Sequence, residues 1–139
     1  MTAQEIMLVR ESFRKLEPMA DQAAALFYAR LFELDPSLRR LFHSDMETQG
    51  RELMQMISTT LSLLDKPENL IPMLRQEGAR YARGGVLEHH YATFGSALLW
   101  TLGKTLVTEF NPAVKSAWAT TYSALAPSMI EGARAAAAA

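Results

Sequence analysis

The chain contains no cysteine. It therefore cannot form a disulfide framework or a thiolate metal site. Long hydrophobic runs are also missing, and no apolar stretch is long enough to cross a bilayer. The N-terminus lacks the basic and then hydrophobic pattern of a signal peptide. We therefore expect a cytoplasmic protein with no membrane partner.

Neither basic nor acidic side chains are in clear excess. The 139 residues carry 14 basic and 15 acidic side chains, for a net charge of −1 at pH 7. A general nucleic-acid binder needs a clustered basic face, so that class of partner is not expected. The length and the 49% hydrophobic content suit one domain with a real core, spanning residues 1–139. The alanine-rich tail, 135–139, receives no function.

Strand patterns are missing too, and the periodicity predicts an all-α fold. Capping residues and prolines mark the expected helix starts. These starts are the capping box Thr2–Glu5, Pro18, Asp35–Pro36, about Met46, about Leu70, Glu88 and Asn111–Pro112. The helix from Asp35 should be very short, and the one from Met46 should run to about Leu64. Pro127 should kink the last helix or loosen one turn, because it removes a backbone donor.

Five blocks of residues match the pattern of a known protein family in their order and spacing. They are Phe27-Tyr28-x-x-Leu31-Phe32-x-x-x-Pro36-x-Leu38-x-x-Leu41-Phe42, Gln49-Gly50-Arg51-Glu52-Leu53-Met54, His90-Tyr91-x-x-Phe94-Gly95-x-x-Leu98-Leu99, Ala117-Trp118-x-x-x-Tyr122 and the segment from Gly78 to Val86. Together they resemble bacterial single-domain globins and the haem domains of flavohaemoglobins. The resemblance covers nearly the whole chain and implies a globin-like, three-over-three helical sandwich. It also implies haem b as cofactor. Because the chain has no cysteine, this haem would not be attached through thioether bonds.

The resemblance assigns roles in a haem pocket. Tyr28 and Gln49 would be the polar pair on the ligand side of the iron, donating hydrogen bonds to bound oxygen or peroxide. The other residues implied to contact haem are Phe42, Leu53, Leu74, Gly78, Arg80, Val86, Tyr91 and Phe94. Among these, Gly78 would let its helix approach closely and Arg80 would pair with a propionate. Several of the apolar members would be core residues even without haem.

Tyr81 occupies the position that matches the iron-binding histidine of the family. Tyrosinate is a hard anionic ligand that favours ferric iron. Three interpretations stay open: Tyr81 binds the iron; a histidine (His43, His89 or His90) or water replaces it; or Tyr81 fills a pocket without haem.

The neighbours of Tyr81 offer its phenolate no evident support on the same helix. Glu77, one turn earlier, has the wrong charge, and Arg80 is expected on another face. The family's acidic partner near the chain end is missing, because Ala133 stands there with Glu131 close by. Gly84 replaces an aromatic residue that family members often carry.

The implied activity is binding of oxygen, nitric oxide, peroxide or a similar small diatomic or anionic ligand. Enzymatic activity would be haem-dependent peroxide or nitrogen-oxide chemistry. Nitric-oxide dioxygenation would need electrons from a separate reductase, and catalase activity is not expected because Gln49 cannot titrate. The alternative function is that of a haem-free sensor or interaction module.

Overall fold

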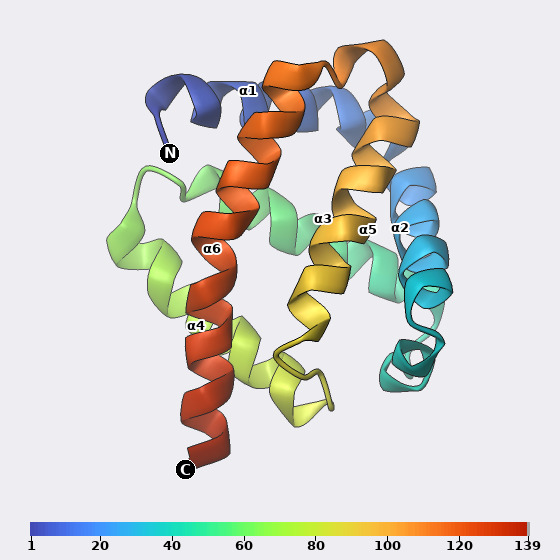
Figure 1. Ribbon diagram of the computed structural model, residues 1–139, viewed down its shortest axis with the longest axis vertical. Helices are drawn as coiled ribbons and strands as arrows, with labels where there is room; N and C mark the ends of the chain where they lie inside the picture. The colour runs from blue at the N-terminus through green and yellow to red at the C-terminus, as the bar shows by residue number, and fades with distance from the viewer. Residues whose placement is uncertain (139) are drawn as a thin grey trace.

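The computed structural model describes residues 1–138, and within that range the only regular elements are helices, with no strand, which confirms the all-α prediction (Figure 1). The α-helices are α1 (Ala3–Leu16), α2 (Ala20–Leu34), α3 (Met46–Ser62), α4 (Pro67–Arg83), α5 (His90–Leu106) and α6 (Pro112–Ala138). Short 3-10 helices η1 (Glu17–Met19), η2 (Pro36–Leu41) and η3 (Val107–Glu109) join them. Residues 135–138 of the alanine tail continue α6, and residue 139 lies outside the described range.

The predicted caps begin the helices as expected. Thr2 and Glu5 form the capping box of α1, with backbone-to-side-chain hydrogen bonds of 2.8 and 3.1 Å. Asp35 caps η2, which is a 3-10 helix, by accepting from the Ser37 amide at 3.1 Å. Asn111 accepts from the Val114 amide at 3.0 Å at the start of α6.

Prolines lie at two of the misplaced helix starts. Pro18 lies within η1, so α2 begins two residues later, at Ala20. Pro67 is the first residue of α4, which therefore starts three residues before the predicted Leu70. Pro127 does not end α6, since the residues on both sides of it are helical, and the expected kink stays a prediction.

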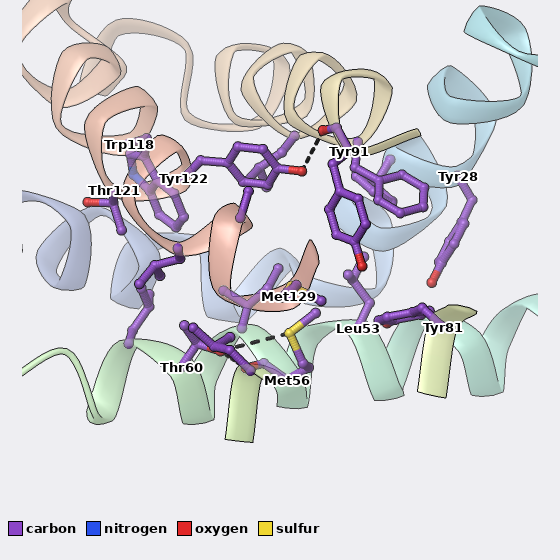
Figure 2. A pocket seen from close by; sticks show the side chains of 18 of the residues that line it. Tyr28, Leu53, Met56, Thr60, Tyr81, Tyr91, Trp118, Thr121, Tyr122 and Met129 are labelled. Atoms are coloured by element: carbon purple, nitrogen blue, oxygen red, sulfur yellow. Dashed lines mark hydrogen bonds between the residues drawn. The ribbon is translucent and has the colours of Figure 1, made fainter. Parts of the chain in front are cut away.

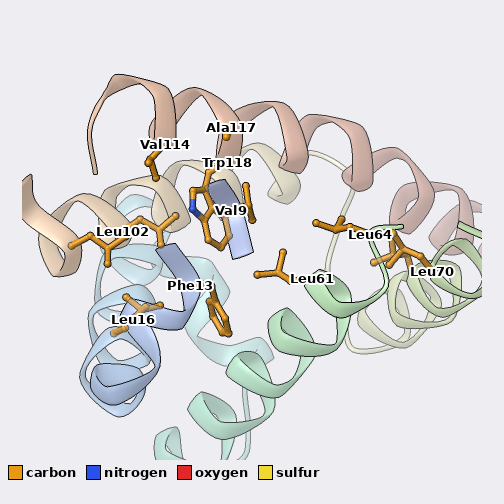
Figure 3. Packing of buried hydrophobic residues seen from close by; sticks show 13 residues of the cluster. Val9, Phe13, Leu16, Leu61, Leu64, Leu70, Leu102, Val114, Ala117 and Trp118 are labelled. Atoms are coloured by element: carbon orange, nitrogen blue, oxygen red, sulfur yellow. The ribbon is translucent and has the colours of Figure 1, made fainter. Parts of the chain in front are cut away.

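The helices form two layers around a common core. In Figure 1, α1 and α3 cross behind α5 and α6, while α4 packs against α6 and crosses behind it, and α2 lies beside α5. The largest buried cluster draws residues from all of the α-helices, α1 to α6 (Figure 3). Its members include Val9, Phe13, Leu16, Leu61, Leu102, Val114 and Trp118. Among residues 1–138, no helix combines the length and hydropathy needed to span a bilayer.

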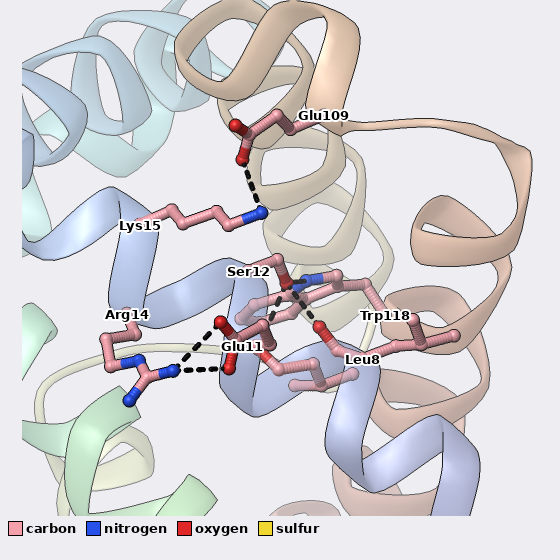
Figure 4. Close-up of polar contacts among 8 residues, drawn as sticks. Leu8, Glu11, Ser12, Arg14, Lys15, Glu109 and Trp118 are labelled. Atoms are coloured by element: carbon pink, nitrogen blue, oxygen red, sulfur yellow. Dashed lines mark hydrogen bonds and ion pairs between the residues drawn. The ribbon is translucent and has the colours of Figure 1, made fainter.

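One buried hydrogen bond crosses this core. The Trp118 indole Nε1–H donates to Ser12 Oγ at 2.8 Å, and Ser12 Oγ lies 2.8 Å from the Leu8 carbonyl oxygen (Figure 4). The Ser12→Ala variant would leave the indole N–H buried without a partner. We expect it to lower the free energy of unfolding by about 1–3 kcal/mol, measured by urea denaturation. A Glu11→Ala variant, which removes only an exposed ion pair with Arg14, should change it by less than about 1 kcal/mol.

The end of α5 holds a strained residue. Val107 has φ 51° and ψ −111°, a backbone conformation that suits glycine and costs a β-branched residue about 1–3 kcal/mol. Its side chain is 64% exposed, so its removal sacrifices little packing. We therefore expect Val107→Gly to raise the melting temperature, whereas the same change at the exposed residue Met7 inside α1 should lower it.

Helices α4 and α6 meet backbone against backbone at two glycines. A β-carbon placed on Gly78 would lie 1.8 Å from the carbonyl oxygen of Met129. One placed on Gly132 would lie 1.9 Å from the carbonyl oxygen of Arg75. Each helix therefore presents a glycine to a carbonyl of the other, and this contact fixes how α4 sits against α6.

Candidate functional site

An apolar cavity lies between α3 and α4 on one side and α2, α5 and α6 on the other (Figure 2). The volume of the cavity that is open to the centres of water molecules is about 130 Å³. On that measure a single water needs roughly 10–15 Å³, so the space is far larger than a packing defect. No Asp, Glu, Lys, Arg or His is among the described residues that line it.

Most of the predicted pocket residues meet at this cavity. Its wall includes Tyr28, Phe42, Leu53, Leu74, Tyr81, Tyr91 and Phe94. They come from α2, the α2–α3 connection, α3, α4 and α5, so the fold joins segments that are distant in sequence. Their predicted contacts with haem stay predictions.

Four predicted residues lie off the cavity wall. Gln49 is half-buried on α3, and its backbone carbonyl oxygen lies 3.4 Å from the Tyr28 hydroxyl. Gly78 faces α6 instead, and Val86 packs in a small buried cluster with Tyr91. The fourth residue, Arg80, is engaged on the protein surface. The Tyr28 hydroxyl thus donates to the Gln49 backbone, and the predicted role of Tyr28 and Gln49 as a polar pair facing a bound ligand stays a prediction.

Part of the cavity wall was not predicted from the sequence. It comes from α3 and α6 and comprises Met56, Ile57, Thr60, Leu61, Trp118, Thr121, Tyr122, Leu125, Ala126 and Met129. The α6 members follow three- and four-residue spacing and so share one helix face. This spacing was a usable signal, but it does not distinguish a cavity wall from a packed core.

Arg80 contacts Tyr81, contrary to the expectation that it points to another face. Its guanidinium lies 4.8 Å from the centre of the Tyr81 ring, a cation–π arrangement. The same group forms a 2.6 Å ion pair with Glu77. Burial raises the pKa of the Tyr81 hydroxyl, and the Arg80 charge acts against that rise. The helix therefore does supply a cation beside Tyr81.

Three further tyrosines line the cavity as neutral phenols. Burial raises the pKa of Tyr28 and of Tyr122 far above the ordinary value, and that of Tyr91 to about 12. The Tyr122 hydroxyl donates to the Tyr91 carbonyl oxygen at 2.6 Å. In contrast, the Tyr91 hydroxyl is buried and has no partner among the described residues.

None of the three histidines lines the cavity. His43 and His89 are exposed, and His90 is buried at the start of α5. The Leu87 amide donates to His90 Nδ1 at 2.8 Å. Neutral His90 therefore carries its proton on Nε2, which lies 3.6 Å from Asp35 Oδ2.

This arrangement also argues against a metal site at the surface. Ligand atoms of Asp35, His89 and His90 lie within 4.8 Å of one another. A metal at His90 Nε2 would need the proton on Nδ1, where the Leu87 amide already donates. The cluster is better described as a contact between His90 and Asp35 that joins the α4–α5 turn to the start of η2. We call this contact the clamp.

The burial of His90 leads to a prediction about how stability depends on pH. Burial and the neighbouring His89 lower the pKa of His90, while Asp35 raises it, and the net shift is downward. A histidine with a lowered folded-state pKa stabilises the protein above its unfolded pKa of about 6.5, and this contribution is lost as the pH falls through the folded-state pKa. We expect the free energy of unfolding to fall between pH 7.5 and 5 by more in the wild type than in His90→Gln. Equal slopes in the two proteins would show that folding does not lower the pKa of His90.

The family's acidic partner is not replaced inside the cavity. Glu131 forms a 2.9 Å ion pair with Arg75 on the surface. Gly85, after α4, has φ 106° and packs against Leu41 of η2, so this turn requires glycine. A β-carbon at Gly84 would make only ordinary van der Waals contacts. Nothing in the structure explains why glycine stands there in place of an aromatic residue.

The helical architecture and the central cavity define a globin. The chain belongs to the globin family, whose sequence profile matches residues 25–129. It is 26% identical over 133 residues to a flavohemoprotein of Deinococcus radiodurans, covering 94% of this chain and 33% of that protein. It is 27% identical over 139 residues to neuroglobin of Tetraodon nigroviridis, covering 90% of this chain and 87% of that protein.

A solved structure shares the fold. The crystal structure of a hexacoordinated heme protein from an anhydrobiotic tardigrade matches with a TM-score of 0.87 at 16% identity, covering 96% of each chain. This match confirms the predicted three-over-three globin fold. The chain spans about a third of the length of the flavohemoprotein that it matches.

Proposed function

We propose that this chain is a haem-binding globin domain in which Tyr81 faces the iron. The observation that carries the proposal is the position of Tyr81. It projects from α4 into the cavity, whereas no histidine lines that wall. Relatives named for haem and a structural neighbour that is a heme protein support the cofactor.

The cavity suits haem in its chemistry. An apolar wall with few polar groups is what a large hydrophobic cofactor needs. Tyr81 can supply an oxygen ligand, and the unpartnered Tyr91 hydroxyl is a polar group that the haem-free cavity leaves unsatisfied. Phe42 and Phe94 supply flat aromatic surface on the wall.

Haem would bring a ferric iron that acts as a Lewis acid and redox centre. Tyr81 would lose its proton to become an anionic ligand, which Arg80 favours through its charge. The Tyr28 hydroxyl, whose donation to the Gln49 carbonyl oxygen is long at 3.4 Å, would donate a hydrogen bond on the ligand side, where Leu53 also lines the wall. Peroxide or nitrogen-oxide chemistry fits this arrangement, and any reductive cycle would draw electrons from a separate reductase.

Hemin titration of the purified protein tests the proposal. We expect uptake of one hemin per chain and a ferric spectrum with a phenolate-to-iron charge-transfer band. A chain that takes up no hemin would refute the proposal.

A second candidate is a haem-free globin module. It is favoured by the lack of a charged side chain on the cavity wall and by the engagement of Arg80 with Glu77 rather than with a propionate. In that case Tyr81 completes the wall, and hemin titration gives no saturable uptake.

A further inference from the structure

Two methionine side chains lie on the wall of the cavity. They are Met56 of α3 and Met129 of α6, and both are half-buried. Figure 2 shows the Met56 side chain projecting from α3 into the cavity, with its sulfur in contact with Thr60. Peroxide oxidises the thioether sulfur of methionine to a polar sulfoxide. The proposed pocket for small oxidising ligands is therefore lined by two groups that such a ligand can modify.

The two sulfurs belong to different sides of the cavity. Met56 packs in the buried cluster that contains Tyr28 and Leu53. It follows Leu53 by three residues, so the two side chains share one face of α3. Met129 packs instead in the cluster that contains Tyr81. With haem bound as proposed, Met56 would lie on the side of the bound ligand, and Met129 would lie on the side of Tyr81.

We propose that Met56 is an oxidation site, which takes one oxygen atom from hydrogen peroxide bound on the ligand side of the cavity. This inference rests on the proposed function. The Met56 sulfur supplies an electron pair to one peroxide oxygen, so the S–O bond forms as the O–O bond breaks. The departing hydroxide takes the proton left on the transferred oxygen. The products are methionine sulfoxide and water, and no further reactant is needed.

Position, not exposure, would make Met56 react first. Dilute peroxide in solution meets exposed sulfurs most often, which favours Met7, a residue that is 67% exposed. Peroxide held beside Tyr28 and Leu53 would be at a much higher local concentration at the Met56 sulfur. Holding two reactants in contact turns a bimolecular step into an effectively unimolecular one and accelerates it.

Thr60 provides a hydrogen-bond donor for the oxidised side chain. Its hydroxyl donates to the Met56 carbonyl oxygen at 2.8 Å and lies 3.8 Å from the Met56 sulfur. A thioether is a weak acceptor, whereas oxidation makes the side chain polar. The sulfoxide would therefore find a partner on α3, but it would also make an apolar wall polar. We expect the oxidised protein to hold an apolar cofactor less firmly.

Peptide mass spectrometry after brief peroxide treatment tests the proposal. Hemin-loaded and hemin-free wild type receive the same small excess of hydrogen peroxide, and the sulfoxide at each methionine is quantified. In the hemin-loaded protein, Met56 should be oxidised faster than Met129 by about tenfold or more, which is a small part of the gain available from holding reactants in contact. In the hemin-free protein, Met7 should be oxidised first, and Met56 should lose its advantage over Met129.

Met56→Leu and Met129→Leu form a matched pair of variants, because leucine conserves the volume of methionine. Each is loaded with hemin and treated with peroxide, and hemin release is then followed by absorbance. Treated wild type and treated Met129→Leu should release hemin several-fold faster than the untreated proteins. Treated Met56→Leu should release it at the untreated rate.

The outcomes separate the inference from the proposed function. If the wild type binds no hemin, the proposed function and this inference fail together. If it binds hemin but Met129 gains oxygen as fast as Met56, only the inference fails, because the oxidation is then general peroxide damage. Equal oxidation of Met56 with and without hemin would also overturn the inference, since exposure alone would then set the rate.

Discussion

Gly78→Ala is expected to lower the free energy of unfolding by about 3 kcal/mol or more, even though alanine is the better helix former. Its new methyl group would lie 1.8 Å from the Met129 carbonyl oxygen, a distance that no side-chain rotation can relieve. Overpacking a well-packed core with extra methylene groups costs typically about 1–3 kcal/mol, and here both sides of the contact are helix backbone. The substitution must therefore push α4 away from α6.

Gly103 supplies the matched control. It lies inside α5, and a β-carbon there would be 3.5 Å from the Phe110 ring, an ordinary contact. Gly103→Ala should therefore stabilise the protein by about 0.4–1 kcal/mol. Urea denaturation of the two variants measures both effects. Similar, small changes in the two would show that α4 and α6 do not touch through Gly78.

The fold was largely predictable because its signals are local. The Thr2 capping box, the Asp35 cap and the Asn111 cap each act within three residues, and each was read correctly from the sequence. The partner of Gly78 was not readable in this way. Met129 lies 51 residues further along the chain, and only the packed structure brings its carbonyl oxygen to the glycine.

The candidate site was predictable only in part. Resemblance placed Tyr28, Leu53 and Tyr81 at one pocket, and the structure brings all three to the cavity wall. The contact of Arg80 with the Tyr81 ring was missed, because helical spacing gives the direction of a backbone position and not the reach of a long side chain.

The unpartnered hydroxyl of Tyr91 could not have been found from sequence either. A phenol in a helix is equally compatible with a wet surface position and with a buried, hydrogen-bonded one. Only the packing of α5 against α6 shows that the hydroxyl is enclosed and without a partner.

Tyr81→Phe should weaken haem binding by more than about 100-fold, because losing a ligand's hydrogen-bond partner alone costs roughly 10–100-fold. Hemin titration with absorbance detection measures the loss, and the phenolate-to-iron band should disappear. The haem-free variant should stay folded, since phenylalanine keeps the ring that lines the cavity. A melting temperature close to that of the wild type would establish this point.

Tyr81→His separates loss of a ligand from a change of ligand. Neutral imidazole suits ferrous iron better than a phenolate does, so this variant should keep haem while its reduction potential rises.

A different result would identify His90 as the iron ligand. If Tyr81→Phe keeps the wild-type spectrum and His90→Ala changes it, the iron is bound by His90. The Leu87 amide would then have to release His90 Nδ1, and the α4–α5 turn would have to move. Because the clamp opposes that movement, we expect Tyr81 to be the residue on which the spectrum depends.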